Sequence, residues 1–403
     1  MAMRSLSPIT GIGDASSKLE AFRSKLTAGS FGKLRDQIKA LYEKHDPSRF
    51  LESRQADQLE KLADAYKEGS LVVVLGAGAS KDYGLPAWDD LMLELHARTF
   101  DQDDPKKDKI DKPTRELLSA LLLFFAPGNP VVFARQIMRR LGGEKHKRSE
   151  KIIQLSEILQ EILYQKVKQP ANSAYKVLAR MLKTSPTDKG IHCIITYNYD
   201  NMLEREIENA GFYNCQPFWS DRDELDKTKK PVFHVHGYLP HSISLKSQPI
   251  LAEDLYHEQY GTPYAWNNVV QLNKFSELTC LFIGCSFADP NLRRLMDIPR
   301  KLWKPKTTRH FLINKQQDDD EMPFHLGLAL QRLAVLQSRR TEGWDRKLAL
   351  KEAHEVQRQI LRIVDAIGAE DLQEFGVETI WIKEYEEIPS ILERIGGILG
   401  GRI

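Results

Sequence analysis

The stretch LVVVLGAGAS, residues 71–80, decides the fold of this chain of 403 residues. Its five aliphatic residues, 71–75, predict a strand buried on both faces, because an uninterrupted apolar run leaves no side for water. The small residues 76–80 follow directly and predict a tight turn at the carboxyl end of that strand. A buried strand that enters a turn of this kind is typical of a parallel sheet covered by helices.

Further short apolar runs predict the other strands of the same sheet. They are IHCIIT (191–196), KPVFHVHG (230–237), LTCLFIGCS (278–286), RHFLIN (309–314) and GVETIWI (376–382). Helical patterns separate these runs, including a long amphipathic helix over residues 344–367 and a closing helix within 388–399. Strands that alternate with helices predict an α/β fold, a Rossmann-like parallel sheet with helices on both faces.

The helical patterns also suggest how the chain is organised. Residues 1–69 are charge-mixed with apolar residues at helical spacing, and they predict an N-terminal helical extension. Residues 70–403 then form one domain, in which residues 100–189 are a helical insertion. A basic patch at 138–151 is interpreted as a solvated helix end plus a loop. We expect the extension and the insertion to provide oligomer contacts or to dock a partner.

Composition excludes several classes of protein. Lys and Arg number 58 against 56 Asp and Glu, which argues against nucleic-acid binding driven by a basic excess. The four cysteines include no C-x-x-C pair, so neither a disulfide scaffold nor a four-thiolate zinc site is expected. No secretory signal is recognised, and the longest apolar run, 117–126, is shorter than the ~20 residues of a membrane span. We therefore expect a cytoplasmic protein without a membrane segment.

Gly76 and Gly78 lie in the turn after the first strand. Glycines allow the backbone to approach a ligand closely, and a following helix start favours an anion such as a pyrophosphate. The turn does not complete G-x-G-x-x-G, since Lys81 stands at the last position, and no P-loop lysine follows. A nucleotide site and a purely structural tight turn both remain open from these residues alone.

The second cluster, Thr196-Tyr197-Asn198-Tyr199-Asp200, follows the strand 191–196. Polar groups at the carboxyl end of a parallel strand stand where open α/β sheets bind ligands. The alternative is that Asn198 or Asp200 caps the helix that begins near residue 201.

The third cluster contains His234 and His236, which share one face of a strand because side chains alternate. The pair could hold a metal, but the sequence offers no H-E-x-x-H and no nearby set of ligands to complete a site. His236 precedes a glycine at the strand end, and an imidazole with an ordinary pKa of about 6.5 can accept a proton there.

The fourth cluster is Gly284 to Asp289, where Ser286 and Asp289 can hydrogen-bond a ribose or a phosphate. Cys285 follows an apolar strand with no evident base nearby, so an inert buried thiol is expected rather than a nucleophile. The chain has no G-x-S-x-G, which argues against an α/β serine hydrolase. Four polar clusters at strand ends of one parallel sheet together predict a nucleotide site.

In order, these residues resemble the SIR2 family. The shared pattern is GAGAS-x-x-x-G-L-P-x-W from Gly76 to Trp88, T-x-N-x-D from Thr196 to Asp200, H-G at His236, and G-x-S from Gly284 to Ser286. The resemblance covers residues 70–295 and extends to the final strand and helix, but it leaves out residues 1–69.

The resemblance implies an NAD+ site without a metal. It implies catalytic roles for Asn198 and for His236 as general base, with the turn 76–80 on the pyrophosphate. Asn198 and Asp200 would hold the nicotinamide ribose and carboxamide region, and Ser286 with its neighbours the adenosine half. Trp88 has the position of the aromatic residue beside the nicotinamide. The residues implied to bind NAD+ are Gly76, Ala77, Gly78, Ser80, Trp88, Thr196, Asp200, Gly284, Ser286 and Asp289.

Two departures separate the chain from sirtuin deacylases. The four-cysteine zinc module is missing, and Asp89 follows the aromatic residue where deacylases usually have Arg. The chain is therefore more similar to the bacterial SIR2-like branch that hydrolyses NAD+ in defence against phage. The function implied is an NAD+ glycohydrolase that depletes NAD+, in a homo-oligomer with a partner such as an ATPase or a sensor. The alternatives are an NAD-dependent deacylase or ADP-ribosyltransferase, and a non-enzymatic NAD+ or ADP-ribose sensor or assembly module.

Overall fold

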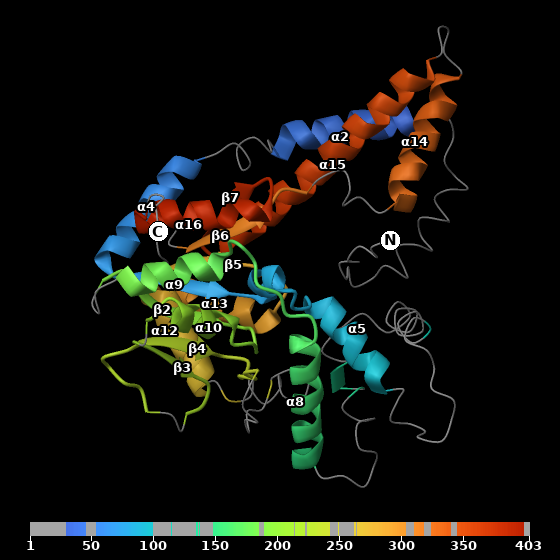
Figure 1. The fold of residues 1–403 in the computed structure, drawn as a ribbon. Coiled ribbons are helices and arrows are strands. Elements are labelled where there is room, and N and C mark those ends of the chain that lie inside the picture. The colour runs from blue at the N-terminus through green and yellow to red at the C-terminus, as the bar shows by residue number, and fades with distance from the viewer. Residues whose placement is uncertain are drawn as a thin grey trace.

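Seven parallel strands form the centre of the structure, which is a computed structural model. It describes residues 30–45, 54–99, 114, 134–135, 137, 148–184, 189–212, 214–221, 224–241, 249, 262, 264–303, 310–317, 324–339 and 345–398. The strands are β1 (Leu71–Leu75), β2 (Ile191–Thr196), β3 (Cys215–Phe218), β4 (Lys230–His234), β5 (Thr279–Ile283), β6 (His310–Lys315) and β7 (Val377–Ile382). Their order is β3-β4-β2-β1-β5-β6-β7 (Figure 1). The predicted α/β fold is confirmed.

Helices connect the strands and cover the sheet. They are α2 (Ser30–His45), α4 (Gln55–Glu68), α5 (Trp88–Thr99), α8 (Arg148–Tyr164), α9 (Ala174–Thr184), α10 (Met202–Asn209), α12 (Trp266–Glu277), α13 (Pro290–Trp303), α14 (Phe324–Ser338), α15 (Arg346–Glu374) and α16 (Ile388–Gly396). Two short 3₁₀ helices, η1 (Ala77–Tyr83) and η3 (Tyr385–Glu387), complete the described elements. None of the described helices is long and apolar enough to cross a membrane.

Strand β1 is buried on both faces, as its aliphatic run predicts. Leu71, Val73 and Leu75 belong to one apolar cluster, whereas Val72 and Val74 belong to a second on the opposite face. The first cluster takes residues from α4, α8, α9, α10 and α16, and the second takes residues from α12 and α13. The alternation of side chains along one strand therefore joins two helical layers across the sheet.

Two elements differ from what the sequence predicts. Strand β3 is short and contains Pro217, and it lies at the edge of the sheet, where strands tolerate a proline. Helix α15 runs on to Glu374 rather than ending near residue 367, because Ala369 and Leu372 continue its buried face. Asp345 begins this helix, since its side chain accepts the N–H of Lys347 at 2.8 Å.

The described parts of the N-terminal segment pack in two places. Helix α2 lies beside α14 and α15, away from the sheet, where Phe31 is buried against Ala353 and Val356 (Figure 1). Helix α4 instead lies beside α16 and places Leu62 in the main cluster. Residues 46–53, between these helices, lie outside the described residues.

The described helices of the segment 100–189 belong to the same core. Leu159 of α8 and Tyr175 of α9 are both buried in the main cluster. Before α8, the described residues of this segment are Thr114, Ala134, Arg135 and Ile137, so most of that part, including most of the basic patch, lies outside the described residues. The boundaries at residues 69, 100 and 189 remain predictions.

The ends of β1 and β5 approach each other closely at the centre of the sheet. The N–H of Gly76 donates to Ile283 O at 3.0 Å, and the N–H of Gly78 donates to Gly284 O at 3.1 Å. Gly284 has a φ of 67°, a left-handed conformation that favours glycine. A Cβ added there would lie 2.3 Å from the backbone nitrogen of Ala79. Only glycine at position 284 permits this contact between the two strand ends.

We predict that Gly284→Ala lowers the free energy of unfolding more than Gly211→Ala, as measured by urea denaturation. Gly211 has a similar φ of 70° but no atom within 4 Å of an added Cβ, so it measures the backbone penalty of about 1–2 kcal/mol alone. Gly284→Ala adds a steric clash with η1 and is expected to cost about 1–3 kcal/mol more. Equal losses for the two variants would show that the strand ends do not constrain each other.

Candidate active site

The four polar clusters lie at the carboxyl ends of four neighbouring strands, β4, β2, β1 and β5. The chain builds β2, β3 and β4 on one side of β1 and then crosses to β5 on the other side. Ligands of open α/β sheets bind at such a change of direction, at the carboxyl ends of the strands. The side chains at these strand ends therefore form the candidate site.

The amide of Asn198 joins the ends of β1 and β2. Its Nδ2 donates to the carbonyl oxygen of Gly76 at 2.9 Å, and it lies 3.0 Å from Ser80 Oγ and 3.1 Å from Tyr175 Oη. A carbonyl oxygen only accepts hydrogen bonds, so the contact with Gly76 fixes which end of the amide is nitrogen. Among the described residues, Oδ1 of Asn198 has no hydrogen-bond partner. That oxygen is the atom of this side chain left to accept a hydrogen bond from water or a ligand hydroxyl.

Asp200 supports Ser80, one of the groups that contact the amide of Asn198. Ser80 Oγ donates to Oδ2 of Asp200 at 2.8 Å, while Oδ1 accepts the N–H of Met202 at 3.0 Å. Burial raises the pKa of Asp200, and the two hydrogen bonds from Met202 and Ser80 oppose that rise. Asp200 thus accepts the first N–H of α10, next to the N-cap residue Asn201, and positions Ser80. A direct contact between Asp200 and a ligand remains a prediction.

His234 fixes the backbone at Asn198. It is buried, with Nδ1 3.1 Å from the carbonyl oxygen of Asn198 and Nε2 2.7 Å from Oε1 of Glu204. Because the carbonyl only accepts, Nδ1 is the donor in the first contact. Both ring nitrogens are engaged, so the metal-binding alternative loses this histidine. Within the described ranges, no group of three or more His, Cys, Asp and Glu is placed to hold a metal ion.

His236 lies two residues further along and faces a different set of groups. Its ring packs edge-on against Tyr197, with ring centroids 4.8 Å apart. Its Nε2 lies 3.5 Å from Oδ2 of Asp289, whose Oδ1 accepts the N–H of Asn291 at 2.8 Å. Burial lowers the pKa of His236, and the carboxylate of Asp289 partly opposes this shift. A neutral imidazole can accept a proton, which is the requirement for a general base.

Helix α12 supports the surroundings of His236 with buried amides. Tyr197 Oη donates to Oε1 of Gln271, and Nε2 of Gln271 donates to the carbonyl oxygen of Asn267 at 2.8 Å. Nδ2 of Asn267 in turn donates to Val235 O at 3.1 Å. These hydrogen bonds link α12 to Tyr197, which packs on the ring of His236, and to Val235, which precedes His236 in the chain. They therefore restrict the position of the His236 ring.

The glycines of the turn after β1 are explained by packing. A Cβ on Gly76 would lie 2.5 Å from Gly284 O, and a Cβ on Gly78 would lie 2.8 Å from Gly284 Cα. The alternative of a tight structural turn is therefore sufficient to account for both residues. Ala77 begins η1, and its half-buried backbone lies beside them. Contact between this turn and a pyrophosphate remains a prediction.

The other predicted site residues have varied surroundings. Oγ1 of Thr196 accepts the N–H of Asn198 at 3.1 Å and so helps to hold that residue. Ser286 is exposed, and its Oγ accepts the N–H of Ala288 at 3.3 Å. Trp88 begins α5 and is partly buried against the main core cluster. Burial raises the pKa of the Cys285 thiol to about 12, so this residue is protonated at neutral pH.

Sequence patterns did not identify three residues that complete the network. Tyr175 on α9 contacts Ser80 and Asn198, but its helical spacing marks it as ordinary core. Glu204 has the spacing of a polar residue on an amphipathic helix, yet it is buried against His234. Gln271 lies 74 residues along the chain from Tyr197, which it contacts, and no local motif marks it.

Comparison with known proteins agrees with the geometry of the strand ends. Residues 192–331 match the SIR2-like domain family, a range that includes Thr196, Asn198, His236 and the segment from Gly284 to Asp289. The predicted resemblance to the SIR2 family is therefore confirmed over these residues. The turn after β1 lies before the matched range.

Three curated relatives carry the same name, NAD(+) hydrolase ThsA. The protein of Bacillus cereus (strain MSX-D12) is 26% identical over 223 residues, which are 55% of this chain and 38% of the relative. That of Acinetobacter baumannii (strain 532279) is 24% identical over 292 residues, 70% of this chain and 51% of the relative. That of Enterococcus faecium is 21% identical over 341 residues, which are 84% of this chain and 57% of the relative. The chain thus spans between 38% and 57% of the length of these relatives.

Proposed function

We propose that this chain is an NAD+ glycohydrolase that cleaves NAD+ to nicotinamide and ADP-ribose. The observation that carries the proposal is the pairing of a fixed Asn198 amide with a buried imidazole, His236, at adjacent strand ends. The SIR2-like domain and the relatives named NAD(+) hydrolase support the choice of substrate.

The reaction breaks the bond between nicotinamide and the ribose C1′. Nicotinamide leaves with the bonding electron pair, positive charge develops on the ribose, and the oxygen of a water molecule bonds to C1′. We assign Oδ1 of Asn198 to accept a hydrogen bond from that water or from a ribose hydroxyl. His236 then accepts the proton that the water loses, because its imidazole is held neutral by burial. ADP-ribose and nicotinamide are the products.

Asp289 is assigned a positioning role for His236. Its Oδ2 faces Nε2 of His236 at 3.5 Å, and its other oxygen is fixed by the N–H of Asn291 at the start of α13. A carboxylate held in this way favours the imidazolium that forms when His236 takes up a proton. Ser286 is exposed, and we assign it to contact the adenosine half of NAD+.

The biological setting is part of the same proposal. The resemblance to bacterial SIR2-like proteins supports an effector of anti-phage defence that depletes NAD+ in the cytoplasm. A homo-oligomer and a partner protein such as an ATPase or a sensor follow from that resemblance. Deacylation, ADP-ribosyl transfer and ligand sensing without catalysis are the alternatives that the experiment below separates.

We predict that His236→Ala and Asn198→Ala each reduce NAD+ cleavage at least about 100-fold, since each removes a group that acts on the reacting atoms. The purified protein is incubated with NAD+, and nicotinamide and ADP-ribose are measured by chromatography. His354→Ala is the matched control, because His354 is an exposed histidine on α15 and is expected to leave the rate unchanged.

A folded His236→Ala protein with unchanged turnover would contradict the assignment. Turnover of an acetyl-lysine peptide would favour the deacylase alternative. Tight binding of NAD+ by calorimetry with no product over hours would favour a sensor.

We further predict a change in pH dependence for Asp289→Asn. The base is active only when unprotonated, and the pKa of His236 is lowered by burial, so the acid limb of kcat/KM lies below the ordinary histidine value of about 6.5. Asp289 raises the pKa of His236, so its neutral replacement moves the acid limb to lower pH. At the optimum, kcat/KM falls about 10- to 100-fold because the ring is less well positioned. An acid limb that stays in place, or that moves to higher pH, would refute this role.

A further inference from the structure

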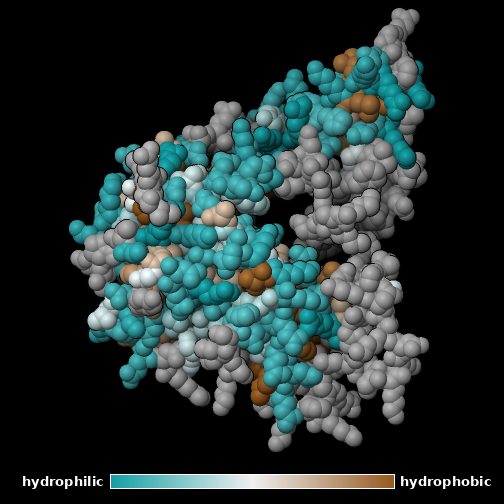
Figure 2. All heavy atoms as spheres, viewed as in Figure 1, coloured by the Kyte–Doolittle hydropathy of each residue, from teal (hydrophilic) through white to brown (hydrophobic). Residues whose placement is uncertain are grey.

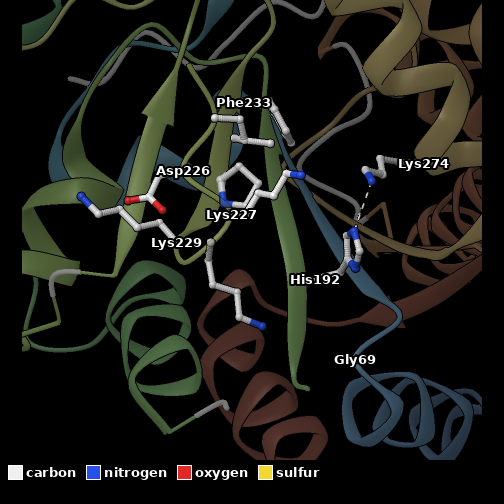
Figure 3. A pocket seen from close by; sticks show the side chains of 10 residues that line it. Gly69, His192, Asp226, Lys227, Lys229, Phe233 and Lys274 are labelled. Carbon is white, nitrogen blue, oxygen red and sulfur yellow. Dashed lines mark hydrogen bonds between the residues drawn. The ribbon is translucent and has the colours of Figure 1, made fainter. Parts of the chain in front are cut away.

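A cavity of about 360 Å³ opens at the opposite edge of the sheet, where the strands begin. It is lined by Gly69, His192, Leu225, Asp226, Lys227, Lys229, Lys230, Pro231, Phe233 and Lys274 (Figure 3). Gly69 precedes β1, His192 is the second residue of β2, and Lys230 is the first residue of β4. The cavity is therefore separate from the candidate active site, which lies at the carboxyl ends of the same strands.

Positive charge dominates the lining. Lys227, Lys229 and Lys274 form no salt bridge with a carboxylate in the part of the chain that the structure describes. The acidic lining residue, Asp226, is engaged in its own turn, because Oδ1 accepts from Thr228 N at 2.9 Å and from Thr228 Oγ1 at 2.6 Å. Asp226 stays negatively charged beside Lys229, but four lysines against one carboxylate leave the lining with a net positive charge that suits an anionic ligand.

Lys230 has a different role from these three lysines. Its Nζ donates to Lys189 O and to Ile191 O at 2.6 Å each, so it braces the start of β2 against the start of β4. This buried contact makes the base of the cavity part of the rigid sheet.

His192 and Lys274 form one side of the cavity. Nζ of Lys274 donates to Nε2 of His192 at 3.1 Å, a contact that requires the imidazole nitrogen to be unprotonated (Figure 3). Burial lowers the pKa of His192, and the charges of Lys274 and Lys230 lower it further, while Glu277 raises it. The ammonium of Lys274 therefore faces a neutral ring, and its charge is not cancelled there.

The remaining lining is apolar. Leu225 is 46% exposed and Pro231 is half-buried. The ring of Phe233, which also lines the cavity, packs against Phe218. In Figure 3, Lys227 and Lys229 lie on the opposite side of the cavity from His192 and Lys274. Cationic groups on two sides with an apolar surface between them suit a ligand that has more than one anionic group and a flat apolar part.

We propose that this cavity is a second nucleotide site, which binds a nucleoside diphosphate. The phosphates contact Lys227, Lys229 and Lys274, and the base lies on Leu225 and Pro231. His192 is the second residue of β2 and Asn198 lies two residues beyond its end, a separation of six residues or about 20 Å in an extended chain. A nucleotide in this cavity therefore does not compete with NAD+ at the carboxyl ends of the strands.

The test is a calorimetric titration with ADP of the full chain and of two charge-matched double variants. Lys227→Glu with Lys229→Glu changes the cavity. Lys347→Glu with Lys351→Glu makes the same change in charge on exposed positions of α15. We expect the cavity variant to bind ADP at least about tenfold more weakly, because charge-assisted contacts are lost, and the control variant to bind within about twofold of the unaltered chain. Equal weakening in both variants, or no binding of ADP to the unaltered chain at millimolar concentration, would overturn the proposal.

Two further titrations distinguish the site and the ligand. Ser286→Trp, which adds a bulky side chain at the exposed position assigned to the adenosine half of NAD+, is expected to retain the ADP binding that Lys227→Glu with Lys229→Glu weakens; the reverse pattern would place the binding in the candidate active site and overturn the proposal. Inorganic pyrophosphate is expected to bind at least about tenfold more weakly than ADP, since it lacks the apolar contact. Equal affinity would overturn the nucleoside assignment. All the substituted lysines are exposed, and circular dichroism checks that each variant folds.

Discussion

The hydrogen bond from Asn198 Nδ2 to the carbonyl oxygen of Gly76 is the contact on which the site depends. It joins the ends of β1 and β2 after their regular pairing stops at Leu75 and Thr196. The same carbonyl oxygen also accepts the N–H of Ala79 at 3.0 Å, so turning the amide over would place Oδ1 against an oxygen that can only accept. The nitrogen of the amide therefore faces Gly76, and Oδ1 has no hydrogen-bond partner among the described residues. A structural requirement thereby sets the direction of the atom assigned to the reaction.

The two histidines at the end of β4, His234 and His236, have different roles: one supports the structure of the site and the other is assigned to the reaction. His234 uses both nitrogens on protein groups, the carbonyl of Asn198 and the carboxylate of Glu204. His236 is buried beside Tyr197 and Asp289. Spacing of two residues places both side chains on one face, but the groups that meet them differ. One ring therefore positions the backbone of the site, and the other is suited to take up a proton.

Apolar runs in the sequence were sufficient to predict the strands β1, β2, β4, β5, β6 and β7, because burial on both faces demands such runs. The edge strand β3 has no such demand and was not predicted. Motifs at strand ends also predict that Asn198 and His236 share one site, and the fold places the two strand ends side by side. They could not show that Tyr175 and Glu204 complete it, since helical residues at ordinary spacing carry no signal of a distant contact.

The visible surface is mainly hydrophilic (Figure 2), so its hydropathy offers little guide to binding sites.

The cavity at the amino ends of the strands could not be predicted from the sequence. His192 and Lys274 are 82 residues apart, and the lysines of the turn before β4 belong to a chain of nearly balanced charge. Only the fold brings these groups together, whereas a net charge of +2 gave no indication of a local basic cavity.

The most direct test of the proposed function is a crystal structure of the His236→Ala variant with NAD+, in which turnover is suppressed. We expect the nicotinamide ribose at the carboxyl ends of β1, β2 and β4, with Oδ1 of Asn198 accepting from a ribose hydroxyl or from a water next to C1′. We also expect the pyrophosphate at the turn formed by residues 76–80. NAD+ bound elsewhere, or a ribose out of reach of Asn198 and of position 236, would refute the proposed function.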